Sequence, residues 1–130
     1  MVGIVLVSHS ALLARGLADV LHQMAGDAVA IEPAGGAPDG GIGTSPDAIE
    51  QAIERVDHGA GVLVFVDMGS AVLSVRTVLA GRPAGSSVQL VDAPLVEGAL
   101  AAAVSASFAD VEAALAAAEE AWSVRKLAPV

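Results

Sequence analysis

The chain has 130 residues, of which 55% are apolar and only 2% aromatic, so Ala, Val and Leu must fill the core of one predicted domain spanning 1–130. Its 6 basic and 15 acidic residues give a formal charge of -9, which argues against nucleic acid and anionic membrane surfaces as partners. The absence of cysteine excludes disulfides, thiolate zinc sites and cysteine nucleophiles. No apolar run has the length of a membrane span and no signal peptide is evident, so we expect a soluble cytoplasmic protein.

The first predicted strand ends directly before a histidine. Residues 2–7 are almost all apolar and rich in valine, which is typical of a buried parallel strand. The strand stops at Ser8, and a helical pattern runs from about Ser10 to Ala25, so His9 is expected in a turn beside a helix N-terminus. A histidine beside an anion site suggests phosphoryl chemistry. The alternative is a turn histidine that only caps the helix or bonds the backbone.

The first helix is predicted to bury one apolar face and to end at Gly26. His22 lies opposite this face and is interpreted as a solvated surface residue. The residues of the apolar face are Leu13, Leu17, Val20, Leu21 and Met24.

A glycine-rich connection at 35–45 leads to the second helix, with Ser45 as its N-cap and Pro46 as its first residue. The connection is not a Walker loop, because no Gly-Lys-Ser/Thr closes it. His58 is expected to close this second helix, where an imidazole suits the negative end of the helix dipole. We therefore interpret His58 as structural.

Three further strands are predicted at 28–31, 61–67 and 87–92. A third helix follows the strand that ends at Asp67 and is predicted to bury Val72, Val75, Val78 and Leu79. From Pro94 onward the chain is Ala-rich and is expected to form two helices. Ser107 is the predicted cap of the second, with Asp110 acting as a weak capping box.

This order of elements predicts an α/β fold with an open, mostly parallel sheet of four to five strands and helices on both faces. Strand order does not follow from the sequence, but the commonest small arrangement places the first strand between the second and third. A crevice then opens between the ends of the first and third strands, with His9 and Asp67 at its lip.

The residues around this crevice suit a phosphorylated histidine. Asp67 would accept a hydrogen bond from one ring nitrogen of His9 and leave the other free as a nucleophile. Ser10, Gly69 and Ser70 would offer hydrogen-bond donors to a phosphoryl group. A serine hydrolase is disfavoured because no Gly-x-Ser-x-Gly occurs, and a zinc site because the three histidines are scattered. We predict no metal and no cofactor.

Four segments, at 3–10, 35–45, 67–71 and 94–99, together resemble a known family. It is the family of DhaM phosphotransferase subunits of phosphoenolpyruvate-dependent dihydroxyacetone kinases, whose domain is of the mannose-type EIIA class of the bacterial phosphotransferase system. The resemblance implies a phosphotransferase and a homodimer, in which His9 is the phosphorylated residue and Asp67 its carboxylate partner. It also implies that HPr donates the phosphoryl group and that ADP on the DhaL subunit accepts it, before transfer to dihydroxyacetone on DhaK.

Two alternatives stay open. Sugar-transport EIIA proteins also resemble the chain, but they typically carry Gly-Gly-Ser-Pro where this chain has Gly69-Ser70-Ala71. The residues Gly43, Thr44 and Ser45 also favour the DhaM family and are expected to touch a docking partner. Longer DhaM chains continue into HPr-like and enzyme-I-like domains, so we expect this chain to use a separate HPr. A non-catalytic anion-binding regulatory module on the same fold is the second alternative.

Overall fold

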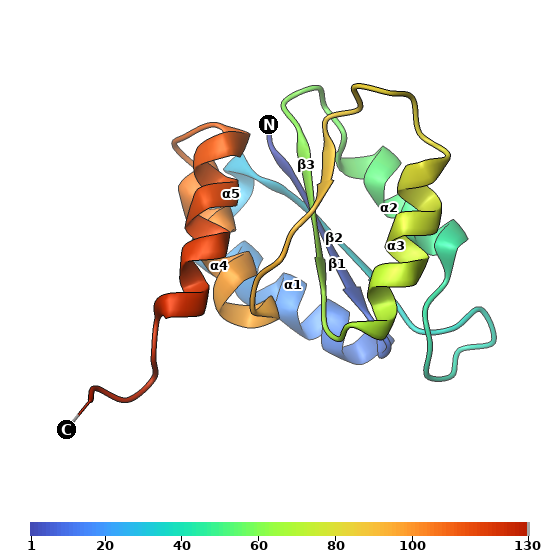
Figure 1. Ribbon diagram of the computed structural model, residues 1–130, viewed down its shortest axis with the longest axis horizontal. Coiled ribbons are helices and arrows are strands. Elements are labelled where there is room, and N and C mark those ends of the chain that lie inside the picture. The colour runs from blue at the N-terminus through green and yellow to red at the C-terminus, as the bar shows by residue number, and fades with distance from the viewer. Residues whose placement is uncertain (130) are drawn as a thin grey trace.

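The computed structural model describes residues 1–129 and contains one central parallel sheet between two layers of helices (Figure 1). The strand order is β2-β1-β3-β4, and every neighbouring pair is parallel. This confirms the predicted α/β class and places the first strand between the second and third. The strands are β1 (Gly3–Ser8), β2 (Ala30–Gly35), β3 (Val62–Val66) and β4 (Val88–Leu90).

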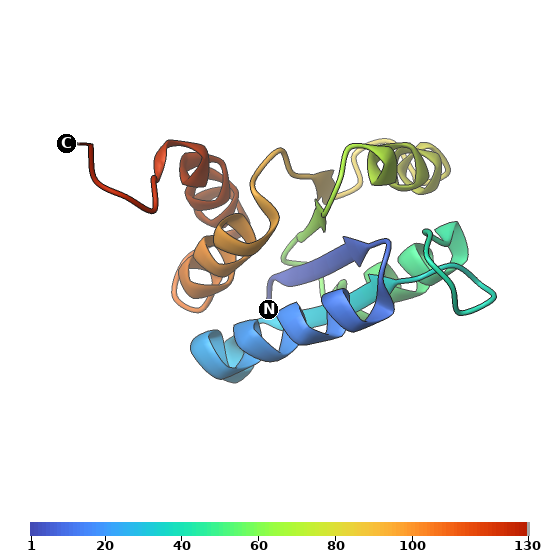
Figure 2. The same ribbon diagram turned by 90° about the horizontal axis from the view of Figure 1, so that it is seen from below.

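Helices cover both faces of the sheet, as Figure 2 shows. Helices α1, α4 and α5 share one hydrophobic core with the sheet, and α2 and α3 share the other. Two short 3₁₀ turns, η1 and η2, follow α1 and α5. The elements are α1 (Ala11–Ala25), η1 (Gly26–Ala28), α2 (Pro46–Val56), α3 (Ser70–Ala80), α4 (Leu95–Ala106), α5 (Val111–Glu120) and η2 (Ala121–Ser123).

Strand β1 is the centre of the fold, and all six of its residues are buried. Alternate side chains of a strand point to opposite faces. Ile4 and Leu6 therefore pack in the core with α1, α4 and α5, while Val5 and Val7 pack with α2 and α3. Fully burying each of these side chains contributes roughly 1.5–3 kcal/mol, so the two cores fix the position of the turn that follows β1.

Strands β1 and β3 match their predicted bounds to within one residue at each end, whereas β2 and β4 differ by more. Strand β2 begins at Ala30 and continues to Gly35, because residues 26–28 form η1 and the strand then pairs in register with all of β1. The pairing carries β2 through Glu32 and Pro33, two residue types that the strand pattern disfavours. Strand β4 is shorter than 87–92 and covers only Val88–Leu90.

The N-cap of α2 is Ser45, as predicted, and the N-cap of α1 is Ser10; their hydroxyl oxygens accept from the N–H groups of Ala48 and Leu13. The predicted cap of α5 was wrong. Asp110 is the N-cap, and its carboxylate accepts from the Ala113 N–H at 2.9 Å. Ser107 lies instead at the end of α4, where its hydroxyl donates to the Val104 carbonyl.

The predicted apolar face of α1 was also partly wrong. Leu13, Val20 and Met24 are exposed, and the buried residues are Ala14, Leu17, Ala18 and Leu21. The small alanines allow α1 to approach β2 closely. A Cβ placed on Gly35 would lie 2.6 Å from the Ser10 carbonyl oxygen, so this contact requires glycine in the strand. Close backbone packing therefore decides the orientation of the helix.

Helix α3 buries Val75 and Val78 as predicted, whereas Val72 and Leu79 are only partly buried. Helix α2 ends at Val56 with Asp57 as its C-cap, so the exposed His58 follows the helix and does not close it. Among residues 1–129, the structure contains no helix with the length and hydropathy that a membrane crossing requires.

Candidate functional site

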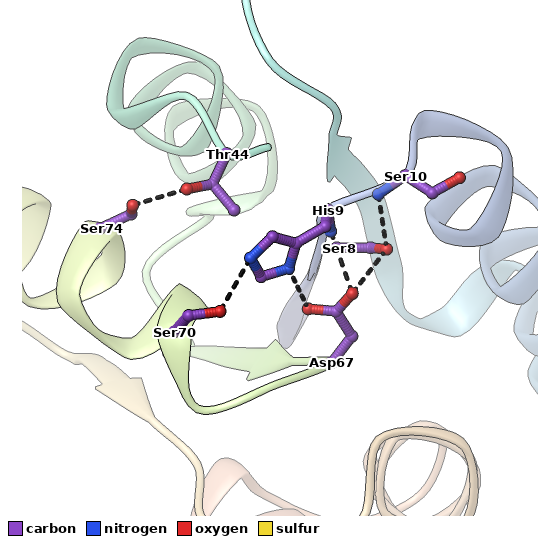
Figure 3. Close-up of polar contacts among 7 residues, drawn as sticks. All are labelled: Ser8, His9, Ser10, Thr44, Asp67, Ser70 and Ser74. Carbon is purple, nitrogen blue, oxygen red and sulfur yellow. Dashed lines mark hydrogen bonds and ion pairs between the residues drawn. The ribbon is translucent and has the colours of Figure 1, made fainter. Parts of the chain in front are cut away.

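The candidate site lies where β1 and β3 end at the same edge of the sheet. These strands are parallel neighbours, and Val7 pairs with Val66 in their register. The residues that follow, Ser8 and His9 on one strand and Asp67 on the other, must therefore lie side by side (Figure 3). The convergence of His9 and Asp67 expected from the sequence is present in the structure.

Asp67 is held by three hydrogen bonds from the β1 turn. Its Oδ1 lies 3.0 Å from His9 Nδ1, and its Oδ2 accepts from the His9 N–H and the Ser8 hydroxyl, each at 3.0 Å. The Ser8 oxygen in turn accepts from the Ser10 N–H at 3.0 Å. The carboxylate thus fixes both the backbone and the ring of His9.

These contacts determine the protonation of the pair. Burial of Asp67 raises its pKa, but the hydrogen bonds from His9 and Ser8 outweigh burial and hold the pKa of Asp67 below its usual 3.8. An ionised carboxylate has no proton to donate, so His9 Nδ1 must be the donor. In the neutral ring Nε2 then carries a lone pair that faces away from Asp67.

The Nε2 atom of His9 contacts the first residue of helix α3. Ser70 Oγ lies 2.9 Å from Nε2, and because Nε2 is an acceptor the Ser70 hydroxyl must donate. Ser70 is the first residue of α3, so the helix begins at the site. The preceding Gly69 has an ordinary helical backbone, and no atom lies within 4 Å of the Cβ position that a larger residue would occupy. The protein's own packing therefore does not require glycine at 69.

The glycine-rich connection at 35–45 forms a further side of the candidate site. The Gly43 N–H donates to the His9 carbonyl at 2.9 Å, and Thr44 Oγ1 lies 2.6 Å from Ser74 Oγ on α3. Of the three residues expected to dock a partner, Gly43 and Thr44 are brought to the site, while Ser45 caps α2.

Ser10 was also expected to meet a phosphoryl group. It lies in the His9 turn, where its N–H already donates to Ser8; its hydroxyl oxygen accepts from Leu13 and keeps its own hydrogen to donate. Ser74 was missed by the sequence reasoning. Its spacing of four residues from Ser70, which places both on one face of a helix, could have revealed it.

The other histidines lie outside this arrangement. His22 and His58 are exposed, on α1 and after α2. The residues that the structure describes contain no group of three or more His, Asp or Glu side chains able to hold a metal ion.

Comparison with known proteins assigns the family. Residues 3–116 match the family model of EIIA-man, described as the PTS system fructose IIA component. The chain belongs to the EIIA-man family. The mannose-type EIIA resemblance inferred from the sequence is thereby confirmed.

Within the EIIA-man family the chain is similar to DhaM proteins. The phosphoryl donor subunit DhaM of the PEP-dependent dihydroxyacetone kinase of Pantoea ananatis is 47% identical over 112 residues, covering 82% of this chain but 24% of that protein. The DhaM subunit of dihydroxyacetone kinase 2 of Listeria innocua is 41% identical, covering 80% of this chain and 85% of that protein. The chain thus spans about a quarter of the first relative and most of the second, and it belongs to the DhaM family.

The fold is also found in a solved structure. The crystal structure of the protein EF1359, described as of unknown function, matches with a TM-score of 0.83 and 37% sequence identity. The match covers 92% of this chain and 93% of that one, so it includes both layers of helices.

Proposed function

We propose that the chain is a cytoplasmic phosphohistidine carrier, the phosphotransferase component of a dihydroxyacetone kinase system. His9 Nε2 accepts a phosphoryl group from HPr and passes it to ADP bound on DhaL, which then phosphorylates dihydroxyacetone on DhaK. The observation that carries this proposal is the Asp67–Nδ1 hydrogen bond, because it leaves the Nε2 lone pair of His9 available at the rim of the sheet. The names of the DhaM relatives, each a phosphoryl donor subunit, support the same role.

The residues of the site can perform both halves of the transfer. The Ser70 hydroxyl turns away from Nε2, whose lone pair attacks the donor's phosphorus. The Nε2–P bond forms as the donor's N–P bond breaks. The ring keeps its proton on Nδ1 and gains positive charge, which the Asp67 carboxylate stabilises. The hydroxyl and the backbone N–H of Ser70, the first residue of α3, then donate to the phosphoryl oxygens. In the second half, an ADP phosphate oxygen attacks the same phosphorus and the Nε2–P bond breaks.

Exposed apolar side chains in the segments that carry His9, Gly43, Asp67 and Ser70 support transfer between proteins. Leu12 lies in the first turn of α1, Met68 follows Asp67, and Leu73 lies in the first turn of α3. Ile42 precedes Gly43, whose N–H bonds His9. These four side chains are between 53% and 78% exposed. Apolar residues gathered around a polar centre are typical of a protein-docking surface.

The same proposal includes a homodimer, and its interface must leave His9 free. A groove of about 600 Å³ runs between α4 and α5, and Leu100, Val104 and Phe108 contribute to its mostly apolar lining. Figure 1 shows this helical hairpin on the opposite side of the molecule from α3. A second copy bound there would leave both transfer sites accessible.

The proposed carrier role is tested by incubation with phosphoenolpyruvate, enzyme I and HPr, followed by intact mass measurement and peptide mapping. We expect one phosphoryl group on His9. The phosphorylated protein is then mixed with DhaL loaded with ADP and, separately, with a mannose-type EIIB protein. Loss of phosphate to ADP alone is expected. Transfer to EIIB would indicate sugar transport, and absence of labelling would favour an anion-binding module.

A further inference from the structure

The Thr44–Ser74 hydrogen bond joins two segments on which His9 depends. Thr44 Oγ1 and Ser74 Oγ are 2.6 Å apart, and both side chains are half-buried. Thr44 ends the glycine-rich connection, whereas Ser74 lies on α3 one turn after Ser70. Among the side-chain hydrogen bonds of residues 1–129, this is the one that links the connection to α3.

The connection itself is attached to the backbone of the His9 turn. The Gly43 N–H donates to the His9 carbonyl at 2.9 Å, and the Gly36 N–H donates to the Ser8 carbonyl at 3.2 Å. Gly36, Gly40 and Gly43 all have positive φ angles, so the segment adopts a conformation that only glycine takes readily. A segment so rich in glycine loses much conformational entropy when it is ordered, and it therefore needs an anchor.

We propose that Thr44 and Ser74 are positioning residues whose hydroxyl pair clamps the glycine-rich connection to α3 and thereby fixes His9 between them. The inference rests on the proposed phosphocarrier function, which it deepens. The pair closes a ring of contacts that runs from Ser74 through Thr44 and Gly43 to His9, and from His9 through Ser70 back to α3 (Figure 3).

This assignment differs from a docking role for Thr44. A docking side chain contributes to partner affinity, so its loss raises the donor concentration needed for half-saturation. A positioning pair contributes to the geometry of in-line transfer, so its loss lowers the rate at saturating donor. The docking role also gives Ser74 no function, since its hydroxyl faces Thr44.

The experiment compares Thr44→Val, Ser74→Ala, the double variant and the conservative Thr44→Ser. Thr77→Val is the matched control, because Thr77 lies on the same helix and its hydroxyl donates only to the Leu73 carbonyl of that helix. Rapid-quench labelling by phosphorylated HPr gives the maximal rate and the half-saturating concentration. Hydrogen exchange of the Gly43 amide reports the clamp without any phosphoryl transfer.

We expect each single variant to lower the maximal rate roughly tenfold while the half-saturating concentration stays within about twofold. The double variant should be no slower than either single one, because both remove the same bond. Thr44→Ser should restore the rate, and Gly43 exchange should accelerate in both single variants but not in Thr77→Val.

Three results would overturn the positioning role. The first is an unchanged hydrogen-exchange rate of the Gly43 amide in the single variants, and the second is a double variant whose loss of maximal rate is the sum of the two single losses. The third is a Thr44→Val variant in which only the half-saturating concentration of HPr changes. Failure of the wild-type protein to take up phosphate would instead refute the carrier function, and Gly43 exchange would still decide whether the clamp exists.

Discussion

The edge of the sheet at His9 and the hairpin of α4 and α5 expose apolar side chains for different reasons. At the sheet edge, the exposed side chains of Leu12, Ile42, Met68 and Leu73 belong to the segments that carry a network in which each carboxylate oxygen of Asp67 has a partner. At the groove of the hairpin the polar side-chain contact is the ion pair of Glu97 with Lys126, and the α4–α5 contact is made by alanine and glycine packed closely together. The polar network fits the proposed transfer chemistry and the close contacts of the hairpin fit a packing role, so substitutions should separate activity from stability.

The largest effect should come from His9→Ala, which removes the proposed nucleophile. We expect labelling by phosphorylated HPr to disappear while the folded structure persists, because the His9 side chain contributes to neither core. Intact mass measurement checks this result. His22→Ala and His58→Ala are matched controls that should label normally, and label retained in His9→Ala would contradict the assignment.

Next in size is Asp67→Asn, which replaces a carboxylate that accepts from Nδ1 with an amide that can donate to it. The ring would then favour the wrong tautomer, and transfer should slow by on the order of a hundredfold or more. Circular dichroism should stay unchanged. If the labelling rate were also unchanged, Asp67 would have only a structural role.

Two glycines sharpen the comparison between the regions. A Cβ on Gly98 of α4 would lie 2.7 Å from the Ala93 Cβ, so Gly98→Val should lower the free energy of unfolding by about 1–3 kcal/mol. Labelling per folded molecule should stay normal.

Gly69→Ala should show the reverse pattern. Its Cβ enters open space beside Ser70, so the free energy of unfolding should change by less than about 0.5 kcal/mol, whereas labelling should slow. Urea unfolding and labelling rates test both; equal behaviour of the two variants would refute the contrast.

The smallest effect concerns acid stability. The pKa of Asp67 is lower in the folded protein than the usual 3.8 of the unfolded chain, so the contribution of this carboxylate is fully present above that value. This stabilising contribution is lost as the pH falls below 3.8 and through the lower pKa of Asp67 in the folded protein, where the folded state also binds a proton at this carboxylate. Asn cannot bind that proton, so the free energy of unfolding of Asp67→Asn should depend less steeply on pH in this range. A wild-type slope in the variant would show that other carboxylates dominate.

The sequence predicted the geometry of the candidate site better than the packing around it. The contact between His9 and Asp67 could be predicted because each directly follows an apolar strand, and parallel strands end at the same edge. Ser74 could not be found as readily, because its proposed role depends on Thr44, which is 30 residues away and reaches it only through the folded connection.

Two of the remaining errors have a common physical origin. The buried face of α1 is set by how closely its alanines approach Gly35, and the extent of β2 is set by pairing with β1. Both depend on tertiary contacts that override the local hydrophobic pattern. The cap of α5 was misplaced because Ser107 and Asp110 are both good capping residues, and only the start of the helix at Val111 decides between them.

The proline in β2 has a consequence for self-association. The N–H groups of Ala30 and Gly36 donate to carbonyls of the β1 segment. The backbone N–H groups of even-numbered residues in β2 therefore face β1, and those of odd-numbered residues face the open edge of the sheet. Pro33 therefore leaves a gap in the middle of the row of donors that a foreign strand would need. In a chain this apolar, that gap protects the long edge of the sheet against strand addition and the fibrous aggregates to which it leads.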